Sequence, residues 1–168
     1  WTQLGTDIDG EASGDLSGYS VSLSADGSRI AIGAFFSTNI NGALSGTTRI
    51  YEYDGTSWNK LGDDIDGEAA GDYSGRSVSL SSDGSKVAIG APNNGGNGNN
   101  AGHVRIYEYS NSSWTQVGAD IDGEAAEDRS GGSVSLSSDG TRVAIGARRN
   151  DGNGNNSGHT RIYELKFE

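Results

Sequence analysis

The sequence is built from three tandem copies of one segment, and this repetition limits the possible fold more than any other feature. A tryptophan opens each copy, at Trp1, Trp58 and Trp114, so the repeat is 57 and then 56 residues long. Residues 58–112 and 114–168 are identical at 37 of 55 aligned positions. Repetition of this kind indicates a supersecondary unit that stacks on copies of itself. We divide the single repeat domain, 1–168, into repeats 1–57, 58–113 and 114–168.

Each repeat contains four short segments with β character. In the second repeat, Val78 and Leu80 alternate with serines, and Ser82-Asp83-Gly84 supplies a hairpin turn. Apolar β-branched residues, short spacing and the lack of helical periodicity exclude substantial helix. The strands expected in this repeat cover 77–81, 86–91, 104–109 and 114–117, with an Asn/Gly-rich loop over 93–102.

Four antiparallel strands in about 56 residues predict one blade of a β-propeller. The predicted fold is therefore all-β, with three four-stranded blades in this chain. A β-trefoil is the alternative, because it also has three four-stranded repeats, although these are usually shorter. The turns rely on Gly, Asn and Asp, because the chain has 28 glycines and a single proline.

The ends of the chain are offset relative to the blades. We expect residues 1–4 to form a fourth strand, whereas the sequence ends soon after a third strand. The strand at 1–5 would then act as the outer strand of a blade that ends near 168. Propellers have about four to eight blades, so three need completion by a second chain or by missing sequence. Two copies would give six blades with two-fold symmetry, and a longer parent chain or an open filament are the alternatives.

The charge of the chain restricts its partners. A net charge of −11 and a pI near 4.4 argue against binding to nucleic acid or to anionic membranes. No apolar run is long enough for membrane insertion. The absence of cysteine leaves the redox compartment open. Asn111 and Asn155 begin Asn-x-Ser patterns and are candidate glycosylation sites.

Two motifs of the second repeat carry a family resemblance. Residues 71–80 (GDYSGRSVSL), followed by 87–92 (VAIGAP), resemble the FG-GAP repeat, and 105–109 and Trp114 extend the match. The resemblance covers all three repeats, with Ser-Gly in place of Phe-Gly. The Gly-Ala-Pro is complete only at 90–92, because the other repeats have Gly33-Ala34-Phe35 and Gly146-Ala147-Arg148. The resemblance implies the β-propeller of integrin α subunits and secreted microbial proteins. It also implies an extracellular or cell-surface location.

Strand alternation places the two long loops of every repeat on one face and the Asp-Gly hairpins on the other. Ligand sites are expected on the face with the long loops, because long loops on rigid scaffolds carry function. The candidates come from the acidic loops and the Asn/Gly-rich loops: Asp64, Asp66, Glu68, Asp72, Asp120, Asp122, Glu124, Asp128, Asn97 and Asn153.

The acidic loops also suggest a cation site. Alternating carboxylates separated by glycine can surround calcium, and the first repeat places them at Asp7, Asp9, Glu11 and Asp15. The glycine is at position 4 instead of 6, however, and no terminal Glu follows. The resemblance implies calcium ligands in a different loop, which is short here. The alternative is a solvated turn in which aspartates cap backbone N–H groups, with no cofactor.

The remaining candidates favour binding over catalysis. His103 and His159 occupy equivalent loop ends and are expected to form hydrogen bonds, and the three tryptophans are expected to pack the blades. Nearly every polar residue recurs, so no asymmetric catalytic set stands out and we predict no enzyme activity. The sequence thus predicts an adhesion, structural or assembly module that associates with itself or with other blades. The alternative is a lectin-like propeller that binds calcium, glycan or protein, with one site per blade.

Overall fold

The computed structural model describes residues 1–166, and these contain strands and no helix. The strands follow the repeats. Their bounds are β1 Ser20–Leu23, β2 Arg29–Ala34, β3 Thr47–Tyr53, β4 Trp58–Lys60, β5 Ile65–Asp66, β6 Ser77–Leu80, β7 Lys86–Ala91, β8 His103–Ser110, β9 Ser113–Gln116, β10 Ile121–Asp122, β11 Ser130–Leu136, β12 Arg142–Ala147 and β13 His159–Glu164.

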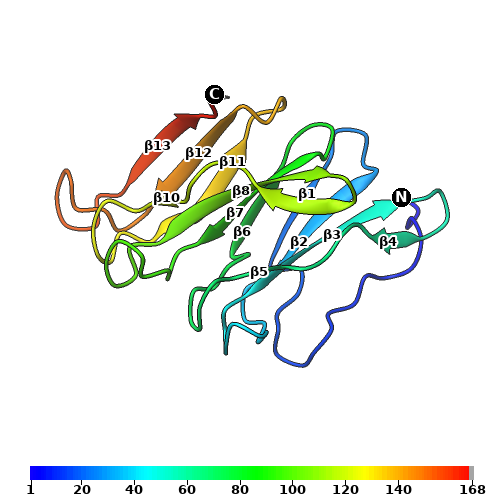
Figure 1. Cartoon of the computed structure of the whole chain (residues 1–168), viewed down its shortest axis with the longest axis horizontal. Helices are drawn as coiled ribbons and strands as arrows, with labels where there is room; N and C mark the ends of the chain where they lie inside the picture. The colour runs from blue at the N-terminus through cyan, green and yellow to red at the C-terminus, as the bar shows by residue number, and fades with distance from the viewer. Residues whose placement is uncertain (167–168) are drawn as a thin grey trace.

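The strands form three antiparallel sheets that lie in a row, with β13 and the N-terminus at opposite ends (Figure 1). The first blade has the order β1-β2-β3-β4 and the second β6-β7-β8-β9, while the third contains β11-β12-β13. Each outer strand, β4 or β9, comes from the start of the following repeat. The predicted all-β architecture of propeller blades is confirmed.

The apolar alternation in the strands fills the space between neighbouring blades. One buried cluster joins Ala31 and Ile50 of the first blade to Val78, Leu80 and other residues of the second. A second cluster joins the second and third blades in the same way, through Ala88, Val104, Ile106, Leu136, Val143 and Ile145. The hydrophobic core is therefore divided into inter-blade layers, so a blade needs a neighbour to bury its faces.

Glycine allows the blades to approach closely. A Cβ atom added to Gly33 would lie 2.0 Å from the carbonyl oxygen of Gly75, and one added to Gly90 would lie 2.1 Å from that of Gly131. Serine hydroxyls bridge the same contact, because Ser20 Oγ donates to the Gly75 carbonyl at 2.7 Å. The two blade interfaces thus repeat one backbone-level contact.

The positions of the loops agree with the prediction. Asp66 pairs with Thr47, at the end of β3 that follows the long loop. Asp83 lies beyond the register pair Leu80–Val87, at the opposite end of its blade. Neighbouring hairpins are joined by hydrogen bonds, from Ala25 N to Ser82 O and from Ser82 N to Ser138 O. The acidic loops and the Asp-Gly hairpins therefore occupy opposite faces.

Three details differ from the sequence prediction. Residues 1–4 form no strand, because they have no partner strand in the described chain. The acidic loops contain an additional two-residue strand, β5 or β10, which pairs with the beginning of β3 or β8. Strand β11 begins early, at Ser130, and has a register shift before Ser133. The expected end of the last repeat, at 167–168, lies outside the described residues.

Candidate functional site

The acidic loops are held against the blades by their own backbones. Strand β5 pairs Ile65 and Asp66 with Thr48 and Thr47, and β10 makes the equivalent pairs with β8. Gly67 N then donates to Gly46 O at 2.8 Å, and a Cβ atom on Gly67 would meet the Ser45 carbonyl oxygen at 2.0 Å. Close packing thus requires glycine after Asp66, and a Cβ atom on the equivalent Gly123 would meet the Ala101 carbonyl oxygen at 2.2 Å.

Asp72 and Asp128, the last acidic residues of their loops, are buried and serve their own turns. Asp72 accepts hydrogen bonds from Ala69 N at 3.1 Å and from Asn94 Nδ2 at 3.0 Å. Asp128 accepts equivalent bonds at the same distances from Ala125 N and Asn150 Nδ2. Each carboxylate therefore fastens an acidic loop to the Asn/Gly-rich loop beside it.

An arginine in the third strand of each blade engages the exposed acidic side chains. Arg49 is paired with Glu11 at 2.6 Å and with Asp64 at 2.9 Å. Partial burial would raise the pKa of Asp64, but hydrogen bonds from Lys60 and Arg49 outweigh burial and lower it. The arginine thus joins acidic residues of two successive repeats.

The same pairing recurs in the other blades. Arg105 pairs with Glu68 and Asp120, and Arg161 with Glu124. Burial opposes ionisation of Asp120, yet hydrogen bonding to Gln116 and the charge of Arg105 lower its pKa. These ion pairs recur from blade to blade along the face that carries the loops.

Each histidine lies beside this network. His103 is buried at the start of β8, with Nδ1 located 3.9 Å from Glu68 and 3.6 Å from Asp120, and this nitrogen has no hydrogen-bond partner. Burial lowers the pKa of His103 and outweighs the opposing charges of Asp120, Asp72 and Asp122. His159 lies 3.6 Å from Glu124 and is more exposed.

The four carboxylates of one acidic loop do not converge on a common point. Among residues 1–166, the groups whose ligand atoms gather are Glu68-His103-Asp120 and Glu124-Asp128-His159. An imidazole with carboxylates suits zinc-like ions better than calcium. Arg105 and Arg161 already pair with the glutamates of these groups, which adds positive charge where a cation would bind.

The other predicted acidic residues are used locally or point to solvent. Asp66 accepts from Thr47 Oγ1 at 2.9 Å, and Asp7 accepts from Gln3 at 2.9 Å. Asp9 and Asp122 are exposed, whereas Asp15 is buried. The set Asp7, Asp9, Glu11 and Asp15 therefore forms no common centre in this structure.

The asparagines divide between structural and exposed positions. Asn97 Nδ2 donates to Gly123 O at 2.8 Å and ties two loops together, whereas Asn153 is exposed. The glycosylation candidates are also exposed, Asn111 in the β8–β9 turn with φ 50° and Asn155 in a long loop.

One cluster of charged residues escaped the repeat-based prediction. Arg76, Arg129, Arg148 and Arg149 gather, and burial together with these like charges lowers the pKa of Arg148. Arg76 also lies over the rings of Tyr19 and Phe35, at 5.0 and 5.1 Å. The sequence does contain a signal for this cluster, namely a departure from the repeat: Arg148 stands where the other two repeats have Pro92 and Phe35.

The tryptophans that open the second and third repeats pack as predicted. Trp58 and Trp114 contact Tyr53 and Tyr109, each with ring centroids 5.1 Å apart. Their indole nitrogens donate to the carbonyls of Leu4 and Leu61, at 3.0 and 2.8 Å. Each indole therefore joins its outer strand to the backbone of the preceding repeat, and both side chains remain partly exposed.

Comparison with protein-family models agrees with this architecture. Residues 64–107 and 117–163 match the family model of the FG-GAP repeat, which is more than half of the chain. Among solved structures, hydrazine synthase from Kuenenia stuttgartiensis is similar at 11% identity and a TM-score of 0.49. The similarity covers 84% of this chain and 32% of that one, so our chain spans about a third of its length. A search of curated proteins gives no match.

Proposed function

Because the chain belongs to the FG-GAP repeat family, we propose that it is a non-enzymatic propeller module that acts in adhesion or structural assembly outside the cell. FG-GAP repeats are typical of extracellular and cell-surface proteins, and their propellers are typically not enzymes. The described residues contain no helix long and apolar enough to cross a bilayer. The module would associate with further blades, including those of a second copy.

The end faces of the row of blades provide the main support for assembly. Val21 and Leu23 of the first blade are 59% and 57% exposed, whereas the equivalent Val78 and Leu80 are 8% and 6% exposed between blades. At the other end, Ile162 is 72% exposed. Exposed apolar patches of this kind mark sites of protein association.

The loop face supports a role without catalysis. Its acidic residues recur in each blade, and they pair with arginines or cap turns instead of forming an asymmetric set. Groups used in this way hold the loops in place and leave few free acids or bases. Arg49 and Arg105, each bound to two carboxylates, are the clearest examples.

Sedimentation velocity over a wide concentration range tests the assembly function. We expect self-association that increases with concentration and that persists when calcium is replaced by a chelator. A chain that remains monomeric up to high micromolar concentration would contradict the proposal. Association that requires calcium would favour the calcium-binding alternative.

The arginine cluster supports a second candidate function, the binding of an anionic group such as a glycan carboxylate or sulfate. Burial and the charges of nearby arginines lower the pKa of Arg148, whereas Glu127 already pairs with Arg129 and Arg149. A bound anion would therefore act mainly on Arg148, by stabilising its charged form. Titration with a sulfated oligosaccharide tests this candidate. We expect binding that Arg148→Pro weakens, because proline is the residue of the second repeat at this position. Equal binding by both proteins would reject it.

A further inference from the structure

The outer strands of the blades are linked by an indole seated in a repeated site. In the second blade, Trp114 contacts Tyr109 and packs beside Leu61 and Tyr107 on the buried cluster. A Cβ atom on Gly62 would lie 2.9 Å from Trp114 Cδ1, so the ring lies directly against this glycine. The site therefore consists of an apolar wall, a bare glycine backbone and the Leu61 carbonyl that accepts the indole N–H.

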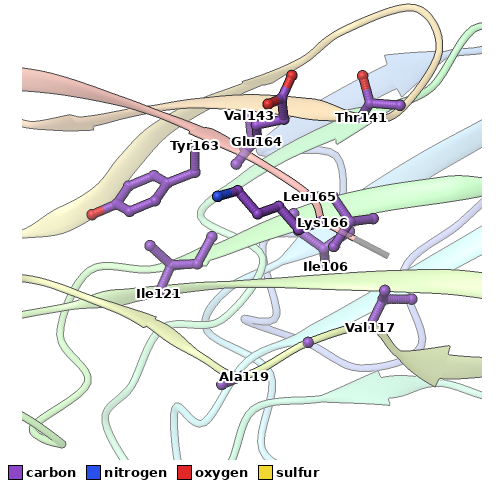
Figure 2. A pocket seen from close by; sticks show the side chains of 11 residues that line it. Ile106, Val117, Ala119, Ile121, Thr141, Val143, Tyr163, Glu164, Leu165 and Lys166 are labelled. Atoms are coloured by element: carbon purple, nitrogen blue, oxygen red, sulfur yellow. The ribbon is translucent and has the colours of Figure 1, made fainter. Parts of the chain in front are cut away.

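The third blade has a cavity at the equivalent site. Its volume is about 180 Å³, and its wall includes Val117, Gly118, Tyr163 and Leu165, as Figure 2 shows for the labelled side chains. In the second blade these positions are held by Leu61, Gly62, Tyr107 and Tyr109, the residues that surround Trp114.

The backbone around the cavity matches that of the filled sites. Leu165 N donates to Thr141 O at 2.7 Å, just as Tyr109 N donates to Ser85 O at 2.8 Å. A Cβ atom on Gly118 would meet nothing within 4 Å, in contrast to the indole that lies against Gly62. The cavity thus has the form of an indole socket, with space above the glycine.

The chain carries one tryptophan that is not seated in such a site. Trp1 is fully exposed, while Leu4, three residues later, already accepts the indole N–H of Trp58. Residues 1–4 therefore lie at the edge of the first blade, where an outer strand of a preceding blade would be. The N-terminus, which carries Trp1, lies at the opposite end of the row from β13 of the third blade, whose Tyr163 lines the cavity (Figure 1).

The polar groups of the two ends are complementary as well. Ser20 and Ser77 donate to the carbonyls of Gly75 and Gly131 across the existing interfaces. Ser133 is the equivalent donor of the third blade, and Gly18 is the equivalent acceptor ahead of the first. A Cβ atom on Gly18 would meet nothing within 4 Å, so its backbone is accessible to a partner.

We propose that the cavity on the third blade is the binding site for Trp1 of a second copy of this chain. The indole contacts Tyr163 and Leu165 and donates to the Val117 carbonyl, as Trp114 does to Leu61. The Ser133 and Ile162 face then receives the exposed Val21 and Leu23 of the same partner. This inference rests on the proposed function, because it identifies the contact through which the module assembles.

Substitutions on both sides of the contact test the proposal. Trp1→Ala removes the indole, and Leu165→Glu places a charge in the socket. Ile40→Ala is the matched control, because Ile40 is 95% exposed but lies in the β2–β3 loop. Trp1 contributes no buried contact within the chain, so Trp1→Ala should leave the fold intact. Circular dichroism and thermal melting at low concentration verify the fold of each variant.

Sedimentation equilibrium then measures the dissociation constant of each protein. We expect Trp1→Ala to weaken self-association about 30-fold or more, the scale of a tryptophan hot spot. Leu165→Glu should weaken it similarly, and Ile40→Ala should have no effect. If the wild-type chain self-associates and Trp1→Ala does not weaken that association, the cavity is not the binding site of Trp1, but the proposed assembly function still holds. A monomeric wild-type chain would overturn both.

A mixing experiment distinguishes the socket from a general loss of surface hydrophobicity. Trp1→Ala keeps an intact socket, and Leu165→Glu keeps an intact Trp1, so the mixture restores one complete contact. We expect the mixture to associate more tightly than either variant alone, with a blue shift of tryptophan emission as Trp1 becomes buried. A mixture no tighter than the separate variants would contradict the proposal.

Discussion

At the scale of the residue, the hairpin aspartates illustrate how short polar side chains replace proline in this chain. Asp83 accepts hydrogen bonds from Ser81 Oγ, Ser85 N and Ser85 Oγ. Hydrogen bonding to Ser81 and Ser85 lowers the pKa of Asp83 to about 2, and Asp26 and Asp139 behave alike in their blades. The ionised carboxylate is thus the form that organises each turn.

We predict that Asp83→Ala lowers the free energy of unfolding by about 1–2 kcal/mol at neutral pH, because several hydrogen bonds are lost. The pKa is depressed in the folded state, so the contribution is present above the unfolded value of 3.8 and is lost as pH falls towards 2. Urea unfolding of the wild type and the variant at neutral pH and at pH 2 measures this contribution. Asp63→Ala is the control, since Asp63 is exposed. A difference that persists undiminished at pH 2 would contradict the argument.

His103 gives a second prediction at this scale. Burial lowers its pKa in the folded chain below the unfolded value of 6.5, so the unfolded state takes up a proton first as pH falls. Stability should therefore decrease below pH 6.5. His103→Thr, with the residue of the first repeat, should make the unfolding free energy less dependent on pH between 6.5 and 5. If His103→Thr leaves the pH dependence of the unfolding free energy unchanged, the prediction is wrong. Glu68 and Asp120 would then compensate the charge of protonated His103.

The roles of individual polar residues were the least predictable part of the sequence. The acidic loop could be recognised, but its carboxylates face different partners: Asp72 its own turn, Asp66 Thr47, and Asp64 the distant Arg49. Those partners come from other strands, and a local pattern does not specify them. The arginine cluster was missed because a repeat-based alignment emphasises shared residues, and Arg148 is a departure from the repeat.

At the scale of the element, the inner strands were predicted almost to the residue. Strand β7 covers the predicted segment, because its apolar β-branched residues fill an interface and a glycine closes it. The segment 1–4 was predicted as a strand and is not one here, since a strand requires a partner for its N–H and C=O groups. The short strands β5 and β10 have only two residues and no alternation to detect.

Two glycines at equivalent positions of their blades, Gly90 and Gly146, give a prediction for a matched pair of substitutions. Gly90→Ala would place a Cβ atom 2.1 Å from the Gly131 carbonyl oxygen, so the two blades must separate. We expect a loss of roughly 1–3 kcal/mol of unfolding free energy, as for other overpacked sites. At Gly146 the nearest group is the Ser133 hydroxyl, which can rotate away. Gly146→Ala should therefore lower the unfolding free energy of the monomer by less than Gly90→Ala does.

Denaturant unfolding under dilute conditions compares the two variants, and sedimentation at high concentration adds a second comparison. Gly146→Ala should weaken self-association, because Gly146 is the equivalent of Gly33 and Gly90 at an open interface. Equal destabilisation of the monomer by both variants would show that interface contacts do not determine the cost.

At the scale of the whole molecule, three blades form a row whose ends present the two halves of one interface. Val21 and Leu23 lie exposed at one end and Ile162 at the other. Where two blades meet, the equivalent positions are buried, except that Val134 is partly buried. We propose that two copies close into a two-fold ring, because both ends then make identical contacts. This closure is the central claim, and it is stricter than self-association alone.

Native mass spectrometry of the intact chain tests the claim most directly. We predict a dominant species of twice the 17.3 kDa chain mass, with no series of larger oligomers as concentration increases. Closure into a ring uses both ends, so further copies have no surface to bind. A mass of one chain at all concentrations, or a ladder of oligomers that lengthens with concentration, would contradict a closed two-copy ring.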